Sequence, residues 1–258
     1  MDSIQASPKY RGFIAAAAVA LLLATAPAAR AQDVSIGTDV VSRYVWRGFD
    51  FGESAAMQPA LAISSGGFQI GVWGSYSLGA DGADANQNDI WASYHIELGD
   101  AGITIGMRDY YFPAPDGPMF FDSDSHYYEA SVGFKLGEAF PLSLYGGFIL
   151  NGEDAEGASQ TPTYLEASLP FYLGDTEMSA TVGMVAQPSD FYKTDEAGLV
   201  NISIGASREI PVTGSFSIPI SVAYILNPSI ETKVMMDDDT TKYLRGRSYL
   251  VFKMSISN

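Results

Sequence analysis

The chain has 258 residues and is strongly acidic, with 30 Asp and Glu against 14 Lys and Arg and a formal net charge of −16 at pH 7. This balance disfavours a nucleic-acid partner, because binding to a phosphate backbone depends on clustered Lys and Arg. Cysteine is absent, which excludes a disulfide framework, a thiolate metal site and a cysteine nucleophile. The length suits a single all-β domain after a short N-terminal segment.

The N-terminal segment has the features of a secretory signal peptide. Lys9 and Arg11 form a positive n-region, residues 13–25 form an apolar h-region, and residues 29–31 form an A-x-A cleavage site. A transmembrane anchor is the alternative, but the apolar run is shorter than the roughly 20 residues that a spanning helix needs. We therefore predict a cleaved signal peptide at residues 1–31, followed by a mature domain at 32–258.

The mature chain shows the two-residue period of β-strands. Ala101, Ile103, Ile105 and Met107 alternate with small or polar residues and lead into the aromatic run 110–112. An apolar row that ends in aromatic residues is typical of a lipid-facing strand at a membrane interface, although a soluble sandwich strand also alternates. The pattern predicts twelve strands, at 34–47, 55–64, 67–77, 89–98, 101–112, 126–136, 140–150, 162–173, 176–187, 198–209, 215–226 and 243–257.

The connections between these predicted strands alternate in length. The short ones are 65–66, 99–100, 137–139, 174–175 and 210–214. The long ones are 48–54, 80–88, 113–125, 151–161, 188–197 and 227–242. Such alternation puts the short turns on one side of a membrane and the long loops on the other, as in outer-membrane barrels. An even number of strands then returns both chain ends to the periplasmic side.

The two faces of the predicted strands differ in polarity. Phe68, Ile70 and Val72 lie on one face of their strand, and Gln69 and Trp73 lie on the other. A polar face is costly in a dry sandwich core, but it suits a lumen that holds water. The predicted fold is therefore all-β, a closed antiparallel up-and-down transmembrane β-barrel of about 12 strands.

The predicted long loops carry clustered acidic residues, such as Asp122, Asp124 and residues 237–239. Carboxylate clusters can bind divalent cations, but no loop has the residue spacing of a calcium loop. We favour solvated loop tips and predict no metal or other cofactor.

Several segments occur in a fixed order along the chain: SRYVWRG at 42–48, GFQIGVWGS at 67–75, YYFP at 110–113 and NPSIE at 227–231. Together they resemble the TorF family of porins, which are outer-membrane proteins of largely unassigned substrate. The resemblance covers most of the mature chain. It implies a barrel and a pore, and it brings no catalytic or ligand residues. Barrels of this type usually end in an aromatic residue that the outer-membrane assembly machinery recognises, whereas this chain ends in Asn258.

Charged residues on the inward rows are the candidate functional residues. The first and last strands of a closed barrel pair, so Arg43, Arg47, Arg245 and Arg247 are expected to gather at the seam. With Arg108 they would form a cationic constriction that selects anions. The favoured alternative is that these arginines pair with inward carboxylates in a network that braces the wall. The carboxylates concerned are Asp39, Asp89, Glu97, Glu129 and Glu166.

The two histidines, His95 and His126, give little support for an enzyme. Hydrolytic catalysis needs a histidine beside a nucleophile and a supporting acid. Ser93 and Glu97 flank His95, but only at the spacing of alternate strand residues. We therefore predict no enzymatic activity. The aromatic residues near the outer strand ends fit an interfacial girdle, with a sugar-stacking surface as the alternative.

The predicted function is passive diffusion of small hydrophilic solutes through a narrow lumen in the outer membrane. Twelve strands lie between the about eight that side chains fill and the about sixteen that leave a wide channel. The alternative is a non-conducting structural or adhesive barrel that presents acidic extracellular loops, and a soluble periplasmic β protein is a third hypothesis. The expected partners are the lipid bilayer, a small hydrophilic solute and the outer-membrane assembly machinery. The sequence does not define the oligomeric state.

Overall fold

The structure is a computed structural model. It describes residues 32–79, 86–113, 120, 125–151, 161–214, 216–235 and 241–257, without the side chains of 231–235 and 241–245. The predicted signal peptide and most of the acidic loop residues lie outside the described residues. In the described ranges, no helix has the length and apolar character that a membrane span requires.

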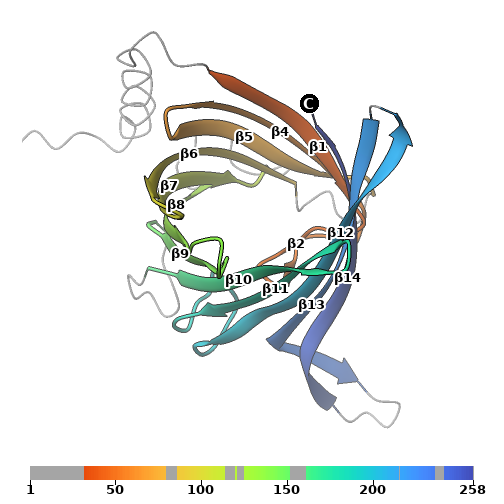
Figure 1. The fold of residues 1–258 in the computed structure, drawn as a ribbon. Helices are drawn as coiled ribbons and strands as arrows, with labels where there is room; N and C mark the ends of the chain where they lie inside the picture. The colour runs from red at the N-terminus through yellow and green to blue at the C-terminus, as the bar shows by residue number, and fades with distance from the viewer. Residues whose placement is uncertain are drawn as a thin grey trace, which may run out of the picture.

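Twelve strands of the described residues close into one barrel. They are β1 (Asp33–Val41), β4 (Ala56–Ser65), β5 (Phe68–Ser77), β6 (Gln87–Leu98), β7 (Ala101–Tyr111), β8 (His126–Lys135), β9 (Ser143–Ile149), β10 (Thr163–Leu173), β11 (Thr176–Val185), β12 (Gly198–Thr213), β13 (Phe216–Met235) and β14 (Thr241–Ser257). Neighbours in the ring pair antiparallel, and β1 pairs with both β4 and β14, which closes it (Figure 1). This confirms the predicted up-and-down barrel.

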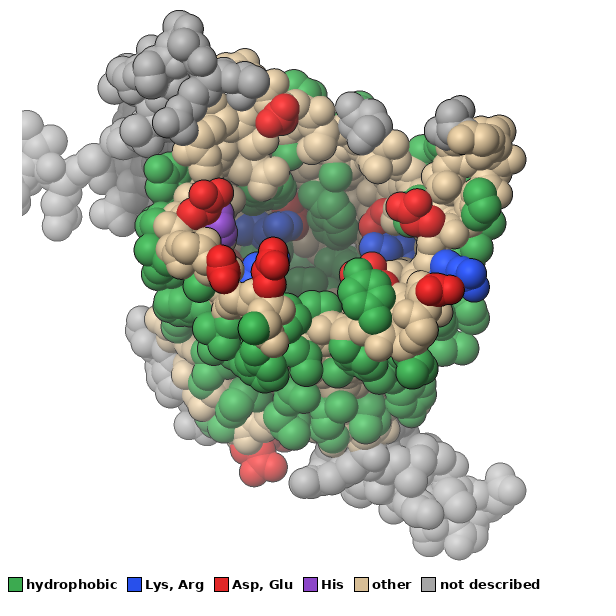
Figure 2. All heavy atoms as spheres, in the orientation of Figure 1, with side chains coloured by type: hydrophobic (Ala, Val, Ile, Leu, Met, Phe, Trp, Pro, Cys, Tyr) green, Lys and Arg blue, Asp and Glu red, His purple; other side chains and the backbone are tan. Residues whose placement is uncertain are grey.

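The two faces of the barrel wall differ as the alternation predicts. The outward rows carry exposed apolar side chains, and Ile36 and Phe252 are 57% and 56% exposed. The inward rows carry buried polar and charged side chains such as Gln58, Asp89 and Glu129. Figure 2 shows hydrophobic side chains over the outer wall and a central hollow with acidic and basic side chains around it. So much exposed apolar surface is expected in lipid rather than in water.

The predicted alternation of short and long connections is confirmed in part, because β8 and β9 are separated by residues 136–142 rather than 137–139, and β13 and β14 by 236–240 rather than 227–242. Residues 66–67, 99–100 and 174–175 join β4 to β5, β6 to β7 and β10 to β11. The predicted short turn at 210–214 is tighter than expected, because β12 continues to Thr213 and β13 begins at Phe216. These turns lie at one end of the barrel, which we call the short-turn end, and the long connections lie at the other.

The predicted first strand, 34–47, is wrong in its second half. β1 ends at Val41, which pairs with Ala56, the first residue of β4. Residues 42–54, here called the lumenal hairpin, have no place in the wall between these two strands. Within this segment, β2 (Val45–Trp46) pairs with β3 (Phe49–Asp50), and Figure 1 shows β2 inside the ring.

The tip of the lumenal hairpin has the backbone of a tight reversal. Arg47 and Gly48 have φ values of 51° and 83°. Positive φ at both central residues is the mark of a type I′ turn, whose twist matches that of the two flanking strands. An extended strand through Arg47 is incompatible with this conformation, which is why the inward row predicted for 34–47 does not extend to Arg47.

The predicted long connection at 227–242 is also wrong in its first half, because β13 continues through Asn227-Pro228 to Met235. A β-bulge between Asn227 and Glu231 absorbs the irregular residues. The Asn227 side chain is fully buried, and its Oδ1 accepts a hydrogen bond from the Ser229 amide at 3.0 Å. Asn227 and Pro228 therefore bend the strand locally without reversing it.

Buried hydrophobic side chains gather where the lumenal hairpin meets the wall. One cluster consists of Tyr164, Val185, Tyr192 and Val200, with Trp46, Phe49, Tyr145 and Phe191 packed against it. The other consists of Val41, Tyr44 and Ala56, with Trp46, Phe51 and Trp73 packed against it. The packed part of the interior is thus built around the hairpin, and Trp46 belongs to both clusters.

Candidate constriction in the barrel lumen

Arg47, at the tip of the lumenal hairpin, is held by the wall across the lumen. Its Nη1 and Nη2 donate to the two carboxylate oxygens of Glu129 on β8, at 2.6 and 3.0 Å. Nη1 also donates to the Tyr192 hydroxyl at 2.6 Å, and Nη2 donates to the Tyr145 hydroxyl at 3.1 Å. The side chains of Arg47 and Glu129 are 8% and 1% exposed. Breaking such a buried, fully hydrogen-bonded pair is costly, so it fixes the position of the tip.

Aromatic rings enclose the same guanidinium. Its central carbon lies 4.3 Å from the ring centroid of Trp46, 4.4 Å from that of Tyr164 and 5.3 Å from that of Tyr145. Cation–π attraction at these distances is strongest where water is excluded. Tyr192 also stacks on Trp46, with ring centroids 6.0 Å apart. Charge and packing therefore hold the hairpin in the same place.

The charge of Arg47 is retained and balanced. Burial by itself would lower the pKa of Arg47, but Tyr192 and Glu129 raise that pKa well above its usual value because they stabilise the charged form. The adjacent carboxylate of Glu129 balances this positive charge. The hairpin tip therefore adds a fixed obstacle to the lumen but little net charge.

Gly48 brings the hairpin against a second part of the wall. A Cβ atom on Gly48 would lie 1.8 Å from the carbonyl oxygen of Val200 on β12, so no larger residue fits. The Nδ2 of Asn227, on β13, donates to the Gly48 carbonyl at 3.2 Å. The tip thus contacts strands β8 to β10 through Arg47 and strands β12 and β13 through Gly48, and it spans the lumen from its origin at β1.

An ion pair joins the two arms of the hairpin. Arg43 Nη1 lies 3.0 Å from Asp50 Oδ2, and the Arg43 guanidinium carbon lies 5.9 Å from the ring centroid of Tyr249 on β14. Burial raises the pKa of Asp50, and the positive charges of Arg43 and Arg247 offset this only in part. Arg43 and Arg247 therefore both lie near the carboxylate of Asp50.

A chain of polar side chains anchors the hairpin base to β6 and β7. The Tyr44 hydroxyl donates to Gln87 Oε1 at 3.0 Å, and Gln87 Nε2 donates to Asp89 Oδ1 at 2.7 Å. Arg108 Nη1 then donates to Asp89 Oδ2 at 2.8 Å. Arg108 therefore takes part in a wall network of the kind that the sequence favoured.

The remaining predicted residues lie apart from the hairpin tip. Asp39 on β1 faces Lys253 on β14 at 3.3 Å. Glu97 is exposed beside the short turn that follows β6. Arg245 lies on β14, where the described residues do not include its side chain. Arg47 does not lie at the seam between β1 and β14, because β1 ends at Val41. The prediction that Arg47 gathers there with the other arginines is therefore wrong.

Tertiary contacts reveal candidate site residues that the sequence analysis missed: Gln87, Tyr145, Tyr164, Tyr192 and Asn227. Each contacts a hairpin residue that lies far away in sequence, so no local pattern marks it. One local signal for the reversal exists, namely Gly48 between the aromatic residues Trp46 and Phe49.

The histidines occupy separate places. His95 Nδ1 lies 2.9 Å from the Thr104 hydroxyl. In His126, on the outward row of β8, Nδ1 lies 2.7 Å from Asp109 Oδ1 and Nε2 lies 2.5 Å from the Phe120 carbonyl oxygen. Among the described residues, no group of three or more His, Asp or Glu side chains could hold a metal ion.

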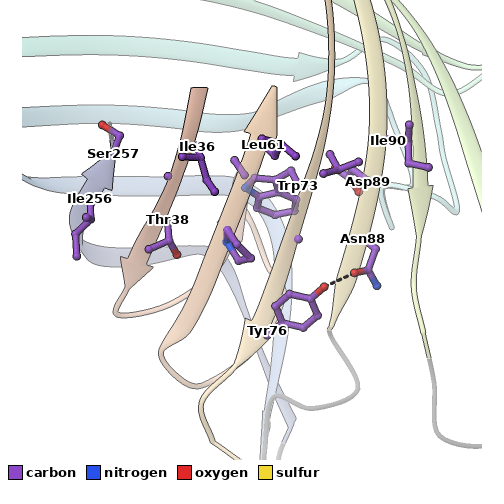
Figure 3. A pocket seen from close by; sticks show the side chains of 15 residues that line it. Ile36, Thr38, Leu61, Trp73, Tyr76, Asn88, Asp89, Ile90, Ile256 and Ser257 are labelled. Atoms are coloured by element: carbon purple, nitrogen blue, oxygen red, sulfur yellow. Dashed lines mark hydrogen bonds between the residues drawn. The ribbon is translucent and has the colours of Figure 1, made fainter. Parts of the chain in front are cut away.

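An apolar groove crosses the outer wall over β1, β4, β5, β6 and β14. Its lining includes Ile36, Leu61 and Ile256, which are 57%, 40% and 44% exposed. Figure 3 shows these side chains, with Tyr76 hydrogen-bonded to Asn88 between β5 and β6. Because the outward rows form this groove, it lies outside the path through the barrel.

Comparison with protein families places the chain in one of them. Residues 25–252 match the model of a family described as "Bacterial protein of unknown function (Gcw_chp)". The chain belongs to the Gcw_chp family. Membership covers almost the whole barrel and assigns no activity, and it does not confirm the narrower resemblance to the TorF family.

Other comparisons add little to the Gcw_chp assignment. No curated protein matches the sequence. A solved structure described as "NanC porin structure in rhombohedral crystal form" has a TM-score of 0.49 and 11% identity, and covers 88% of this chain and 98% of that chain. Another, described under "Unveiling the Mechanism Behind the in-meso Crystallization of Membrane Proteins", has a TM-score of 0.46 and 9% identity, and covers 87% and 83%. Neither match bears on the function.

Proposed function

We propose that this Gcw_chp protein is an outer-membrane channel for the passive diffusion of small hydrophilic solutes. We further propose that export removes residues 1–31 and that the outer-membrane assembly machinery inserts the barrel. The resemblance to the TorF porins points in the same direction. The lumenal hairpin is the constriction of the proposed channel.

The outer surface supports the membrane location. Exposed apolar residues follow the outward rows from β1 to β14, with Val72, Ile105, Val182 and Leu250 all more than 45% exposed. A closed barrel also pairs every wall strand, which satisfies the backbone polar groups that lipid cannot. The alternation of short turns and long loops supports an orientation with the short turns in the periplasm.

The single observation that carries the channel proposal is a peptide hairpin held by charge across a polar lumen. Arg47 crosses to Glu129, and Tyr44 is linked through Gln87 to Asp89. A barrel with a purely structural role needs no ordered segment in its interior. A channel uses one to set the diameter and the chemistry of its narrowest part.

Single-channel recording tests this proposal. The mature protein, refolded in detergent and added to planar bilayers, is expected to give discrete conductance steps, and liposomes that contain it are expected to swell in small sugars, amino acids or organic acids. Detergent alone and heat-denatured protein are the controls. Silence across many verified insertions, with no swelling in any solute, would reject the channel.

The alternative of a non-conducting structural or adhesive barrel has one observation in its favour. The hairpin tip contacts the wall on two sides, through Glu129 and Val200, so the same segment that narrows a pore is also placed to seal one. Deletion of residues 43–53 separates the two functions. A silent wild type that conducts after the deletion indicates a sealed barrel, whereas a conducting wild type indicates a channel.

A further inference from the structure

Three arginines of the lumen are paired with carboxylates. Arg43, Arg47 and Arg108 lie 3.0, 2.6 and 2.8 Å from the carboxylates of Asp50, Glu129 and Asp89. Lys253 lies 3.3 Å from Asp39. At these positions a solute that reaches the hairpin therefore meets paired charges. This arrangement weakens the physical basis for an anion filter built from Arg43, Arg47 and Arg108.

Unpaired carboxylates surround the short-turn end of the lumen. Asp33, Glu97 and Glu177 lie on the inward rows of β1, β6 and β11, as the pairing register places them. All three are exposed, and within the described residues none forms an ion pair. Glu177 accepts a hydrogen bond from the Ser207 hydroxyl at 3.2 Å.

These carboxylates are spread around the ring. In the strand order of the barrel, β1, β6 and β11 are well separated from one another, so the negative charge faces the opening from different sides. Among the described residues, the cation without an ion-pair partner on an inward row at this end is Lys135, at the end of β8. With Glu209, which is exposed on the inward row of β12 at the same end, four carboxylates against one ammonium group leave this mouth net negative.

Another carboxylate without an ion-pair partner among the described residues lies deeper in the lumen. Glu166, on β10, accepts hydrogen bonds from the Tyr164 hydroxyl at 2.5 Å and from Asn201 Nδ2 at 3.4 Å. Its partners in the described chain are thus neutral donors, and no cation offsets its charge. Arg247 on β14 is exposed, and it lies near Asp50 toward the long-loop end, beside Asn227.

From this distribution we infer that the channel prefers cationic solutes to anionic ones. The inference rests on the proposed channel function. Rings of acidic side chains favour cations in pores, and a narrow, low-dielectric opening strengthens their local field. The transported class is then small hydrophilic cations and neutral solutes, and the selecting groups are the carboxylates of the short-turn mouth rather than the arginines of the hairpin.

Reversal potentials in planar bilayers with a KCl gradient test this inference. The wild type is expected to be more permeable to K⁺ than to Cl⁻. The variant Asp33→Asn/Glu97→Gln/Glu177→Gln is expected to lower the permeability ratio by at least about twofold. The matched control Asp100→Asn/Glu138→Gln/Asp175→Asn removes the same charge from turns at the same end and is expected to change the ratio less.

Two outcomes overturn the inference alone: anion-selective conductance steps in the wild type, or equal permeability ratios in the wild type and the Asp33/Glu97/Glu177 variant. Absence of any conductance step overturns the channel proposal and this inference together. Gel mobility of the folded barrel before and after heating verifies that each variant has folded, so loss of folding is not counted as loss of selectivity.

Discussion

The guanidinium group of Arg47 and the carboxylate of Glu129 form two hydrogen bonds, at 2.6 and 3.0 Å, although the two residues are 82 positions apart in the chain. One residue lies at the tip of a hairpin inside the barrel, and the other lies on the wall across the lumen. The pair therefore decides whether residues 42–54 stay across the lumen, and it is the natural target for the first experiments.

We expect Arg47→Ala to increase single-channel conductance and to lower stability. The substitution leaves Glu129 buried without its partner, which typically costs about 3–5 kcal/mol. Planar bilayer recording measures the conductance, and urea unfolding in detergent micelles measures the free energy of unfolding.

A double variant separates loss of the Arg47–Glu129 contact from loss of stability. Arg47→Met/Glu129→Leu removes both charges together, so we expect it to be more stable than Arg47→Ala, because no unpaired charge remains buried. Its conductance should still exceed that of the wild type. If both variants conduct like the wild type, the Arg47–Glu129 pair does not control the constriction.

We expect Gly48→Ala to displace the hairpin and change the conductance. A methyl group there meets the Val200 carbonyl at 1.8 Å and must also adopt a φ of +83°. Gly99→Ala is the matched control, because Gly99 has a φ of +67° with nothing within 4 Å of the added carbon. The control should cost about 1–2 kcal/mol from backbone strain alone and leave conductance unchanged. Equal effects of the two substitutions would disprove the close approach to Val200.

Docking of the lumenal hairpin should depend on pH through Asp50. Burial raises the pKa of Asp50 in the docked state, with Arg43 offsetting this only in part. The docked hairpin therefore binds the proton more tightly than the undocked hairpin. Docking should be more favourable near the ordinary aspartate pKa of about 3.9 and should weaken as pH rises through the raised pKa of Asp50.

Tryptophan fluorescence measures this pH dependence. Trp73→Phe/Trp91→Phe leaves Trp46 as the reporter on the hairpin, since the chain has three tryptophans. Adding Asp50→Asn should abolish the change in Trp46 emission over that pH range. A pH dependence that survives Asp50→Asn must come from another group.

We expect a charge to be far more costly on the outer face of β14 than on its inner face. Phe252 faces outward and is 56% exposed, whereas its neighbour Val251 faces the lumen. Phe252→Arg should destabilise the barrel in lipid by about 2–4 kcal/mol if its position is near the bilayer midplane. Val251→Arg should cost less, because its charge is hydrated in the lumen. The comparison requires unfolding in lipid vesicles, and equal costs would argue against lipid on the outer face.

Local sequence patterns were sufficient to predict the strands of the barrel wall. Alternation of apolar and polar residues depends only on the strand period, so segments such as 101–112 predicted both a strand and its two faces. The short turns also left local marks, since turns such as 99–100 and 174–175 contain glycine. Local patterns gave a wrong prediction at Asn227-Pro228, where they predicted the start of a loop. The buried side chain of Asn227 has tertiary partners, and the strand continues through a bulge.

The candidate site was predicted only in part. The sequence identified Arg43, Arg47, Arg108 and Glu129 as inward charges, and the pairing of arginines with carboxylates was the favoured interpretation. It could not place Arg47, because an extended strand and a hairpin fit the same residues until the partner strands are known. The pairing of Val41 with Ala56 excludes residues 42–54 from the wall and so sends them inside.

The sequence by itself therefore determined the class of protein: a closed β-barrel with an apolar exterior, short turns at one end and long loops at the other. These features follow from residue periodicity and glycine placement, which act over a few neighbouring residues. Only the tertiary structure decided that residues 42–54 lie inside the barrel and which charges there have no ion-pair partner. Both features depend on contacts between strands that are distant in sequence. Burial destabilises a charge that has no partner, whereas an ion pair presents little net charge to a passing solute.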